Sequence, residues 1–171
     1  MLNFEKIDVR MLENATKAIG DDWMLITVRD EENNRINAMT ASWGALGYLW
    51  RRPVCICFVR PERHTFGLLE EQKEFSIAFL KDSDREAYNV CGRESGADLD
   101  KLAKCGLSSS EIDGIPIISE AQTVLTCKVL YEDDIKENGF LETSILSNYA
   151  NAGYHRMYIC EILGAYEKNE K

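Results

Sequence analysis

Six short apolar segments, most of them not separated by helices, constrain the fold of this chain more than any other feature. They lie at residues 23–30, 35–42, 53–60, 74–80, 123–132 and 157–167. Their apolar and β-branched composition favours β-strands. The polar turn 31–34 between the first two segments predicts a hairpin. Pro61 ends the third, since proline cannot extend a strand ladder.

Helical patterns are fewer and shorter. They cover residues 66–73, where Thr65 is the expected N-cap, and residues 82–92 and 98–106, each of which starts with acidic residues and ends at a glycine. Because strands and helices do not alternate regularly, a doubly wound parallel sheet is disfavoured. We expect a mainly β chain, an antiparallel barrel with a few short helices. No GxGxxG dinucleotide fingerprint occurs.

Length and charge narrow the function classes. The 171 residues suit one domain, here 1–171, and the net charge of −9 disfavours a nucleic-acid partner. No segment approaches the roughly 20 apolar residues of a membrane span, and the N-terminus has no apolar leader core. We therefore expect a cytoplasmic protein with no membrane partner and with reduced thiols. Cys55 and Cys57 would share one face of a strand. We expect both to be buried apolar thiols, and a redox or metal-binding pair is the alternative. We predict no metal site.

The hexapeptide RPERHT, residues 60–65, indicates an anion site. It lies where a predicted strand meets a predicted helix, so free N–H groups and the helix dipole would favour an anion there. Arg60 and Arg63 could grip phosphate with bidentate forks, and Thr65 could cap the helix or bind an oxygen. A solvated basic loop that balances nearby glutamates is the alternative.

The heptapeptide NAMTASW, residues 37–43, adds a second part. Thr40 and Ser42 alternate with Ala41 on an extended segment, which leaves backbone groups open beside small side chains. A flat aromatic ligand could approach this backbone, with Trp43 as an apolar wall. The alternative is that Trp43 belongs to the core and the hydroxyls belong to a turn.

These two stretches, in this order and spacing, resemble the flavin reductase-like family, the FMN-binding split barrels that include flavoredoxin. EFSIAFL (74–80), AYNVCGRESGADLDKLAKCGL (87–107), IPIISEAQTVLTCKVL (115–130) and NYANAGYHRMYICEI (148–162) also resemble family segments. The resemblance covers roughly residues 23–166. Three positions depart from the family pattern: His64, where tyrosine is frequent; Ala78, where asparagine is common; and Cys160, where glycine is usual.

The resemblance implies a split β-barrel of Greek-key type that binds FMN without a covalent bond, as a homodimer. Met39, Thr40, Ala41 and Ser42 would line the flavin ring and ribityl chain, with Trp43 nearby. The implied phosphate ligands are Arg60, Arg63 and Thr65, with His64 beside them and Lys101 as a further candidate. His155 would meet the nicotinamide or another substrate. Surface and structural roles remain the alternatives for Lys101 and His155.

The implied chemistry belongs mainly to the cofactor, so no catalytic acid or base is nominated. One expected function is an oxidoreductase that passes electrons from NADH or NADPH through FMN to a flavin, ferric or protein acceptor. The alternatives are an FMN-carrying electron-transfer protein and a flavin-binding module. The long connection 132–158 carries several aromatic and apolar residues, and a loop of this length usually has a role of its own. Covering a partner subunit's flavin site is one such role, and packing on its own barrel is the alternative.

Overall fold

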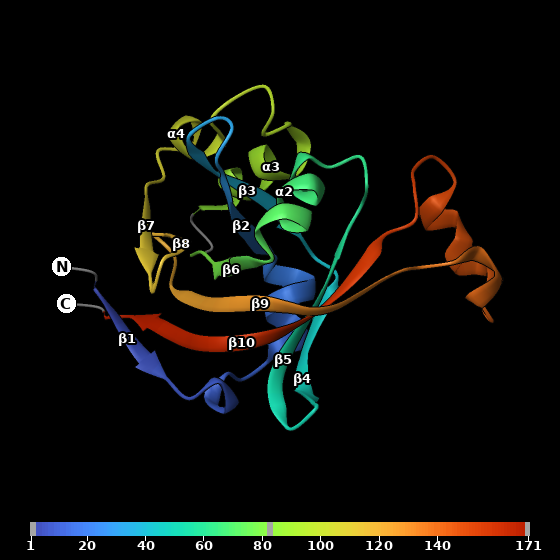
Figure 1. Ribbon diagram of the computed structural model, residues 1–171, viewed down its shortest axis with the longest axis horizontal. Coiled ribbons are helices and arrows are strands. Elements are labelled where there is room, and N and C mark those ends of the chain that lie inside the picture. Colours follow the sequence, from blue (N-terminus) through green and yellow to red (C-terminus); the bar gives the residue numbers. More distant parts are fainter. Residues whose placement is uncertain (1–2, 82–83, 170–171) are drawn as a thin grey trace.

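The computed structural model describes residues 3–81 and 84–169. Its main feature is an antiparallel sheet whose two edge strands are consecutive in the chain. The main sheet has the order β3-β2-β6-β9-β10-β5-β4, and β1 adds to β10. Every pairing in it is antiparallel. β3 and β4 stand at opposite ends of this order, so the barrel does not close between them (Figure 1). The expected antiparallel split barrel is confirmed.

The strands of the main sheet are β1 (Phe4–Ile7), β2 (Met24–Asp30), β3 (Arg35–Ala41), β4 (Gly44–Leu49), β5 (Arg52–Val59), β6 (Glu74–Phe79), β9 (Thr123–Asp134) and β10 (Arg156–Lys168). A separate hairpin is formed by β7 (Ser109–Ile112) and β8 (Ile115–Ile118). All six predicted strands are present within about two residues of their expected ends. β1, β4, β7 and β8 were not predicted.

The helices are α1 (Ala15–Lys17), α2 (His64–Gln72), α3 (Arg85–Arg93) and α4 (Lys101–Lys104). Short 3₁₀ segments, η1 (Val9–Met11), η4 (Glu137–Gly139) and η5 (Thr143–Tyr149), accompany a π-helix, η2 (Ala18–Asp22). No helix in the described ranges has the length and apolar character needed to cross a membrane. Of the helix predicted over 82–92, positions 82 and 83 lie outside the described residues.

The prediction that Thr65 caps α2 is wrong. The helix begins two residues earlier than predicted, at His64, with Arg63 at the N-cap and no side-chain capping bond. The Thr65 side chain instead points inward. It is 1% exposed, and its hydroxyl accepts a hydrogen bond from Asn37 Nδ2 at 2.8 Å. A buried hydroxyl needs a partner, so the tertiary contact with β3 outweighed the local capping preference.

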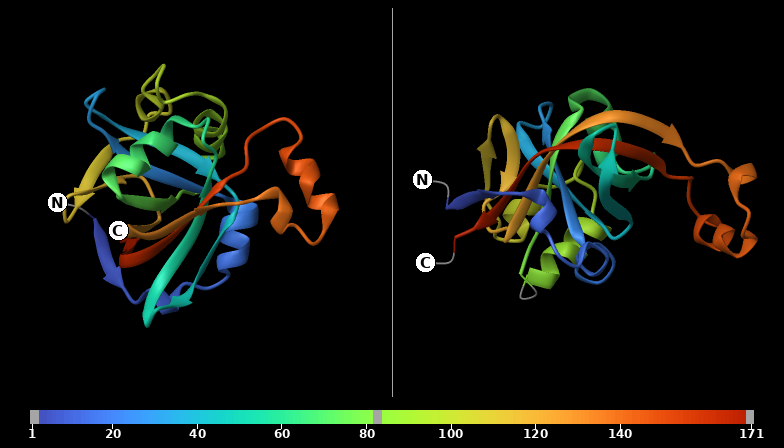
Figure 2. Two further views of the ribbon diagram at one scale, coloured as in Figure 1. Left: turned by 45° about the vertical axis from the view of Figure 1, so that its right-hand side comes forward. Right: turned by 90° about the horizontal axis from the view of Figure 1, so that it is seen from below.

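Two cores lie on either side of the sheet. The barrel interior buries Leu69 of α2, Phe75 and Tyr158, together with the thiols of Cys55 and Cys57. Full burial of a side chain such as Phe75 contributes about 1.5–3 kcal/mol. The second core packs α3, α4 and β8 over β2, β3 and β6 (Figure 2).

The thiols of Cys55 and Cys57 are buried on one face of β5, as expected for that strand. Cys55 Sγ lies 3.5 Å from Cys127 Sγ, and all six cysteines are unpaired. In the described part of the chain, no group of three or more histidine, cysteine or acidic side chains is arranged to hold a metal ion.

The segment between β9 and β10, residues 135–155, extends away from the barrel as an arm (Figure 2). Leu141 on this arm is fully exposed, and Ile145 is partly exposed. The arm corresponds to the long connection that the sequence analysis singled out.

Candidate functional site

A cavity of about 240 Å³ opens where the barrel splits, beside the two-residue link between β3 and β4. Its lining consists of Met39, Thr40, Ala41, Ser42, Trp43, Phe58, Arg60, Arg63 and His155. All of these except Phe58 were singled out from the sequence. Because β3 is an edge strand, its outer backbone groups have no strand partner in the described residues. A flat ligand could therefore pair with that edge.

A second cavity of about 160 Å³ lies beside it and shares Arg63. It is lined by Glu62, Arg63, His64, Thr65, Arg93, Glu94, Ser95, Gly96 and Lys101. The sequence-predicted residues are thus divided between two neighbouring cavities, with Arg63 lining both. Together the cavities suit an elongated ligand that is flat at one end and anionic at the other. We therefore call the 240 Å³ cavity the ring cavity and the 160 Å³ cavity the anion cavity.

Arg63 holds the end of α3 against this site. Its guanidinium donates to the carbonyl oxygens of Gly92 and Cys91 (3.0 Å to the latter). A guanidinium carries five N–H donors, so these two bonds leave donors for a ligand. Burial lowers the pKa of Arg63, and no ion pair of Arg63 with a carboxylate is found in the described residues. The positive charge is therefore incompletely compensated.

Lys101 is the second cation of the anion cavity, and unlike Arg63 it is buried. It is 3% exposed, and its ammonium makes one long hydrogen bond, 3.4 Å to the carbonyl of Glu94. Burial, reinforced by the neighbouring charges of Arg63 and Arg35, lowers its pKa to about 8. Among the described residues no carboxylate forms an ion pair with it. A buried ammonium without a counterion is costly, and an anion in this cavity would remove that cost.

The His64 ring is directed at a carboxylate of the protein. Its Nε2 lies 2.8 Å from Oδ2 of Asp30, which is fully buried. Arg35 lies 3.7 Å from the same oxygen. The ring still lines the anion cavity, so Asp30 fixes its orientation there. Asp30 was not recognised in the sequence, because the pairing joins positions 34 residues apart.

Gly96 lines the anion cavity and packs against Asn37 of β3, and we call this pair the floor of the cavity. A Cβ atom on Gly96 would lie 1.9 Å from Oδ1 of Asn37, so only glycine fits there. Oδ1 of Asn37 is buried without a hydrogen-bond partner in the described structure. Buried polar atoms normally have partners, so this oxygen is an exception in the described structure.

An aromatic group closes the ring cavity. The ring centroid of Trp43 lies 5.0 Å from that of His155 and 6.4 Å from that of Tyr149. Trp43 remains 43% exposed, so it forms a wall rather than part of a core. Burial, together with the charge of Arg60, lowers the pKa of His155 to about 4. The imidazole is therefore neutral at physiological pH.

Arg60 and Thr40 line the ring cavity, but their side chains also form hydrogen bonds with backbone carbonyls of the protein. Arg60 donates to the carbonyl oxygens of Gly153 and Asn148, at 2.9 and 3.0 Å, and so holds the arm. Its guanidinium also lies over the Tyr149 ring. The Thr40 hydroxyl donates to the Tyr88 carbonyl at 2.6 Å, so it is engaged away from a ligand.

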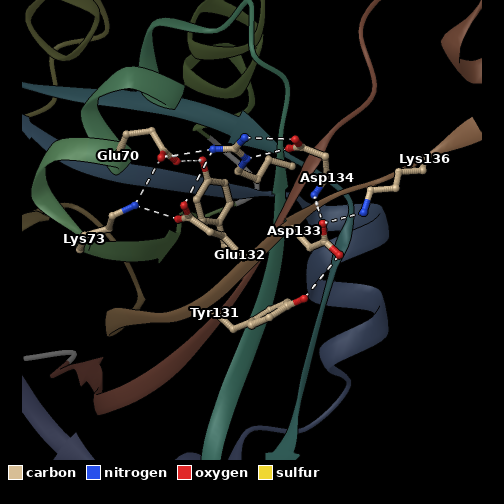
Figure 3. Close-up of polar contacts among 9 residues, drawn as sticks. Glu70, Lys73, Tyr131, Glu132, Asp133, Asp134 and Lys136 are labelled. Atoms are coloured by element: carbon tan, nitrogen blue, oxygen red, sulfur yellow. Dashed lines mark hydrogen bonds and ion pairs between the residues drawn. The ribbon is translucent and has the colours of Figure 1, made fainter.

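A charge network fixes the base of the arm and the start of β10 (Figure 3). Arg156, next to His155, pairs with Asp134 at 2.7 Å and with Glu70 of α2 at 3.2 Å. Glu70 also accepts a 2.7 Å hydrogen bond from the Tyr158 hydroxyl. Lys73 links Glu70 to β9, which it contacts at Glu132. The network thus joins α2, which begins at the anion cavity, to β10, the strand that starts directly after His155.

A larger cavity of about 590 Å³ lies elsewhere, between the β2–β3 turn, α4 and β7. Its arginines are already engaged: Arg29 pairs with Glu111, and Arg35 donates to the carbonyls of Gly96 and Ala97. We place the candidate site at the two smaller cavities, because Arg63 and Lys101 there form no ion pair with a carboxylate of the described residues, whereas Arg29 pairs with Glu111 and Arg35 with Asp30.

The chain is similar to known proteins both by sequence family and by fold. A family model described as "Flavin reductase like domain" matches residues 18–171. No curated protein matches the chain by sequence.

Solved structures share the fold at low sequence identity. An FMN-binding domain of flavin reductases-like enzyme from Shewanella baltica has a TM-score of 0.69 at 19% identity, over 97% of this chain and 78% of that one. Flavoredoxin of Desulfovibrio vulgaris has a TM-score of 0.69 at 18% identity, with the same coverage. An FMN-binding protein from Thermus thermophilus, with bound p-hydroxybenzaldehyde, has a TM-score of 0.68 at 19% identity, over 96% of this chain and 82% of that one.

Proposed function

The chain belongs to the flavin reductase-like family, and from this premise we propose that it is an FMN-binding oxidoreductase. It would move electrons from NADH or NADPH to a flavin, ferric or protein acceptor. The observation that carries the FMN assignment is a pair of cations, the half-buried Arg63 and the buried Lys101. Neither forms an ion pair with a carboxylate of the described residues, and they lie beside a cavity walled by Trp43.

The residues present fit a phosphorylated flavin. Arg63, Lys101 and the uncapped N-terminus of α2 would hold the phosphate, with Arg93 at the rim. The open edge of β3, from Met39 to Ser42, would pair with the polar edge of the ring. Arg60 would act by holding the arm over the site. Thr65 would shape the floor through its bond to Asn37.

Bound flavin supplies the hydride and electron chemistry, and the protein supplies orientation and electrostatics. Backbone N–H groups of β3 directed at the ring would stabilise negative charge on it. His155 is neutral at pH 7, so it would contact a nicotinamide or other substrate by packing and hydrogen bonding rather than as a cation. Trp43 and Tyr149 would shield the ring cavity from water.

A second candidate function is electron transfer between proteins without efficient NAD(P)H oxidation. The similarity to flavoredoxin favours it. Steady-state oxidation of NADH and NADPH, with and without added FMN, separates the two functions. Rapid oxidation supports the enzyme. Stable FMN binding without nicotinamide oxidation supports the carrier.

The cofactor assignment is tested by replacing both Arg60 and Arg63 with alanine. The yellow cofactor should be lost, and FMN affinity in a fluorescence titration should fall at least about tenfold, since charge-assisted hydrogen bonds contribute roughly 1.5–3 kcal/mol each. Arg52→Ala is the matched control. Arg52 pairs with Glu161 and lines neither cavity. Undiminished affinity in the folded double variant would refute the assignment.

We also propose a homodimer, in which the arm reaches a second copy. The fully exposed Leu141 and the partly exposed Ile145 on the arm support this. Light scattering of the FMN-loaded protein should give twice the chain mass, and a monomer would contradict the proposal. The unpaired cysteines favour a reducing compartment, so we place the protein in the cytoplasm, which cell fractionation would check.

A further inference from the structure

Another cavity, of about 370 Å³, lies on the far side of the β3–β4 link and shares Ser42 and Trp43 with the ring cavity. We call it the Trp43 cavity. It is lined by Ala15, Thr16, Ile19, Gly20, Ser42, Trp43, Gly44, Ala45 and Leu46. None of these residues is charged, although 29% of the chain is. The other two cavities at the site both contain arginine.

The polar groups that the Trp43 cavity offers are neutral. β4 is the other edge strand of the split barrel, and no described strand pairs with its outer edge. α1 and η2 pack against β4, and they form the opposite wall of the cavity (Figure 1). Unpaired backbone groups and the hydroxyls of Thr16 and Ser42 can donate or accept hydrogen bonds at the edge of a ligand.

The wall formed by η2 has an unusual backbone. Residues 18–22 form a π-helix, a rare geometry that is frequent at functional sites. It ends at Trp23, whose φ of 71° is strained for a bulky residue. Arg85 holds this end, because it donates to the carbonyls of Asp21 and Asp22 and lies 3.7 Å from the Trp23 ring. The backbone conformation of this wall is therefore fixed by tertiary contacts rather than by the local conformational preference of its residues.

We propose that the Trp43 cavity binds a neutral, planar compound with carbonyl or amide groups at its edge, of the quinone class. Trp43 offers an aromatic face, and the β4 edge offers hydrogen bonds of both kinds. A nicotinamide dinucleotide does not fit, since its diphosphate would find no cation in the lining. The proposed role of this compound as an electron acceptor beside the flavin rests on the proposed function. Binding itself does not need the flavin.

Two glycines allow a matched test. Gly20 lines the cavity, and a Cβ added there meets no atom within 4 Å. Gly47 on β4 is equally unobstructed but does not line the cavity. Gly20→Leu would therefore fill the cavity, and Gly47→Leu is its control. Ala45→Leu fills it from the opposite wall, should Gly20→Leu fail to fold.

The experiment titrates FMN-loaded protein with menadione and follows binding by isothermal titration calorimetry without any reductant. Wild-type and Gly47→Leu proteins should bind it saturably and alike. Gly20→Leu or Ala45→Leu should weaken binding at least tenfold. Each variant should keep its flavin absorption. A variant that loses FMN bears on the proposed function and not on the Trp43 cavity, so the absorption spectrum distinguishes the two failures.

Three binding results would overturn the proposal, and a competition result would contradict its choice of ligand. One is the absence of saturable binding to the wild type. Another is equal affinity in the filled variants and the control. The last is an affinity that falls as protein concentration rises, since that would mean that a second copy of the chain covers the cavity. Displacement of menadione by NADH at equal concentration would also contradict the separation of this cavity from a nicotinamide site.

Discussion

Replacing Lys101 with methionine should make the FMN-free protein more stable while it weakens FMN binding. The lysine is 3% exposed and has no carboxylate partner among the described residues, and burial lowers its pKa from 10.5 to about 8. At about 1.4 kcal/mol per pH unit, holding this charge costs the folded protein up to about 3 kcal/mol at pH 7. Methionine keeps an apolar stem of similar length without the charge.

The sign of the pH dependence follows from the lowered pKa. Between pH 8 and 10.5 the unfolded chain binds the Lys101 proton and the folded chain does not, so the unfolding free energy of the wild type rises across this window. The cost is fully present below pH 8. The advantage of Lys101→Met should therefore be largest at pH 7 and should shrink towards pH 10.

Urea unfolding of the FMN-free proteins at pH 7 and pH 9.5 measures this effect. Lys104→Met is the control, since Lys104 is half-exposed, pairs with Glu94 and should change stability by less than about 1 kcal/mol. FMN affinity should fall at least about tenfold in Lys101→Met and stay unchanged in the control. A Lys101→Met protein that is less stable at pH 7, with no convergence at pH 9.5, would refute the reasoning that this cation lacks a counterion.

Three further predictions concern other parts of the site. His155 has a pKa lowered to about 4, so its protonation favours unfolding and stability should fall from pH 6.5 to pH 4. Its ring proton should show no NMR titration above pH 5.5, and His155→Gln should lose this acid sensitivity. Gly96→Ala should cost about 1–3 kcal/mol in urea unfolding and weaken FMN binding, because its Cβ would overlap Asn37; an unchanged protein would show that the floor is not tightly packed. Tyr158→Phe should cost about 1–2 kcal/mol, since it removes the bond to Glu70, and no loss would mean that Glu70 is satisfied by Arg156 and Lys73 alone.

Most strands could be predicted from the local pattern of apolar residues. Segments such as 53–60 and 74–80 are apolar on both sides, and only a strand of a covered sheet buries both faces in so few residues. β4 was missed because GALGYL contains two glycines and is mostly exposed, so it lacks the composition of a strand. It forms because β5 supplies its hydrogen bonds.

The candidate site was likewise only partly predictable from the sequence. Residues 39–43 and 60–65 could be nominated from the sequence, because small residues, arginines and a strand-to-helix junction lie within a few positions of one another. By itself, then, the sequence determined the strands, the hairpin and the two stretches of chain that carry the site. Tertiary structure alone decided that β3 and β4 become the open edges of the barrel and that Lys101 is buried beside Arg63. Strand order and the removal of a charge from water depend on distant partners, and no local pattern of residues encodes these partners.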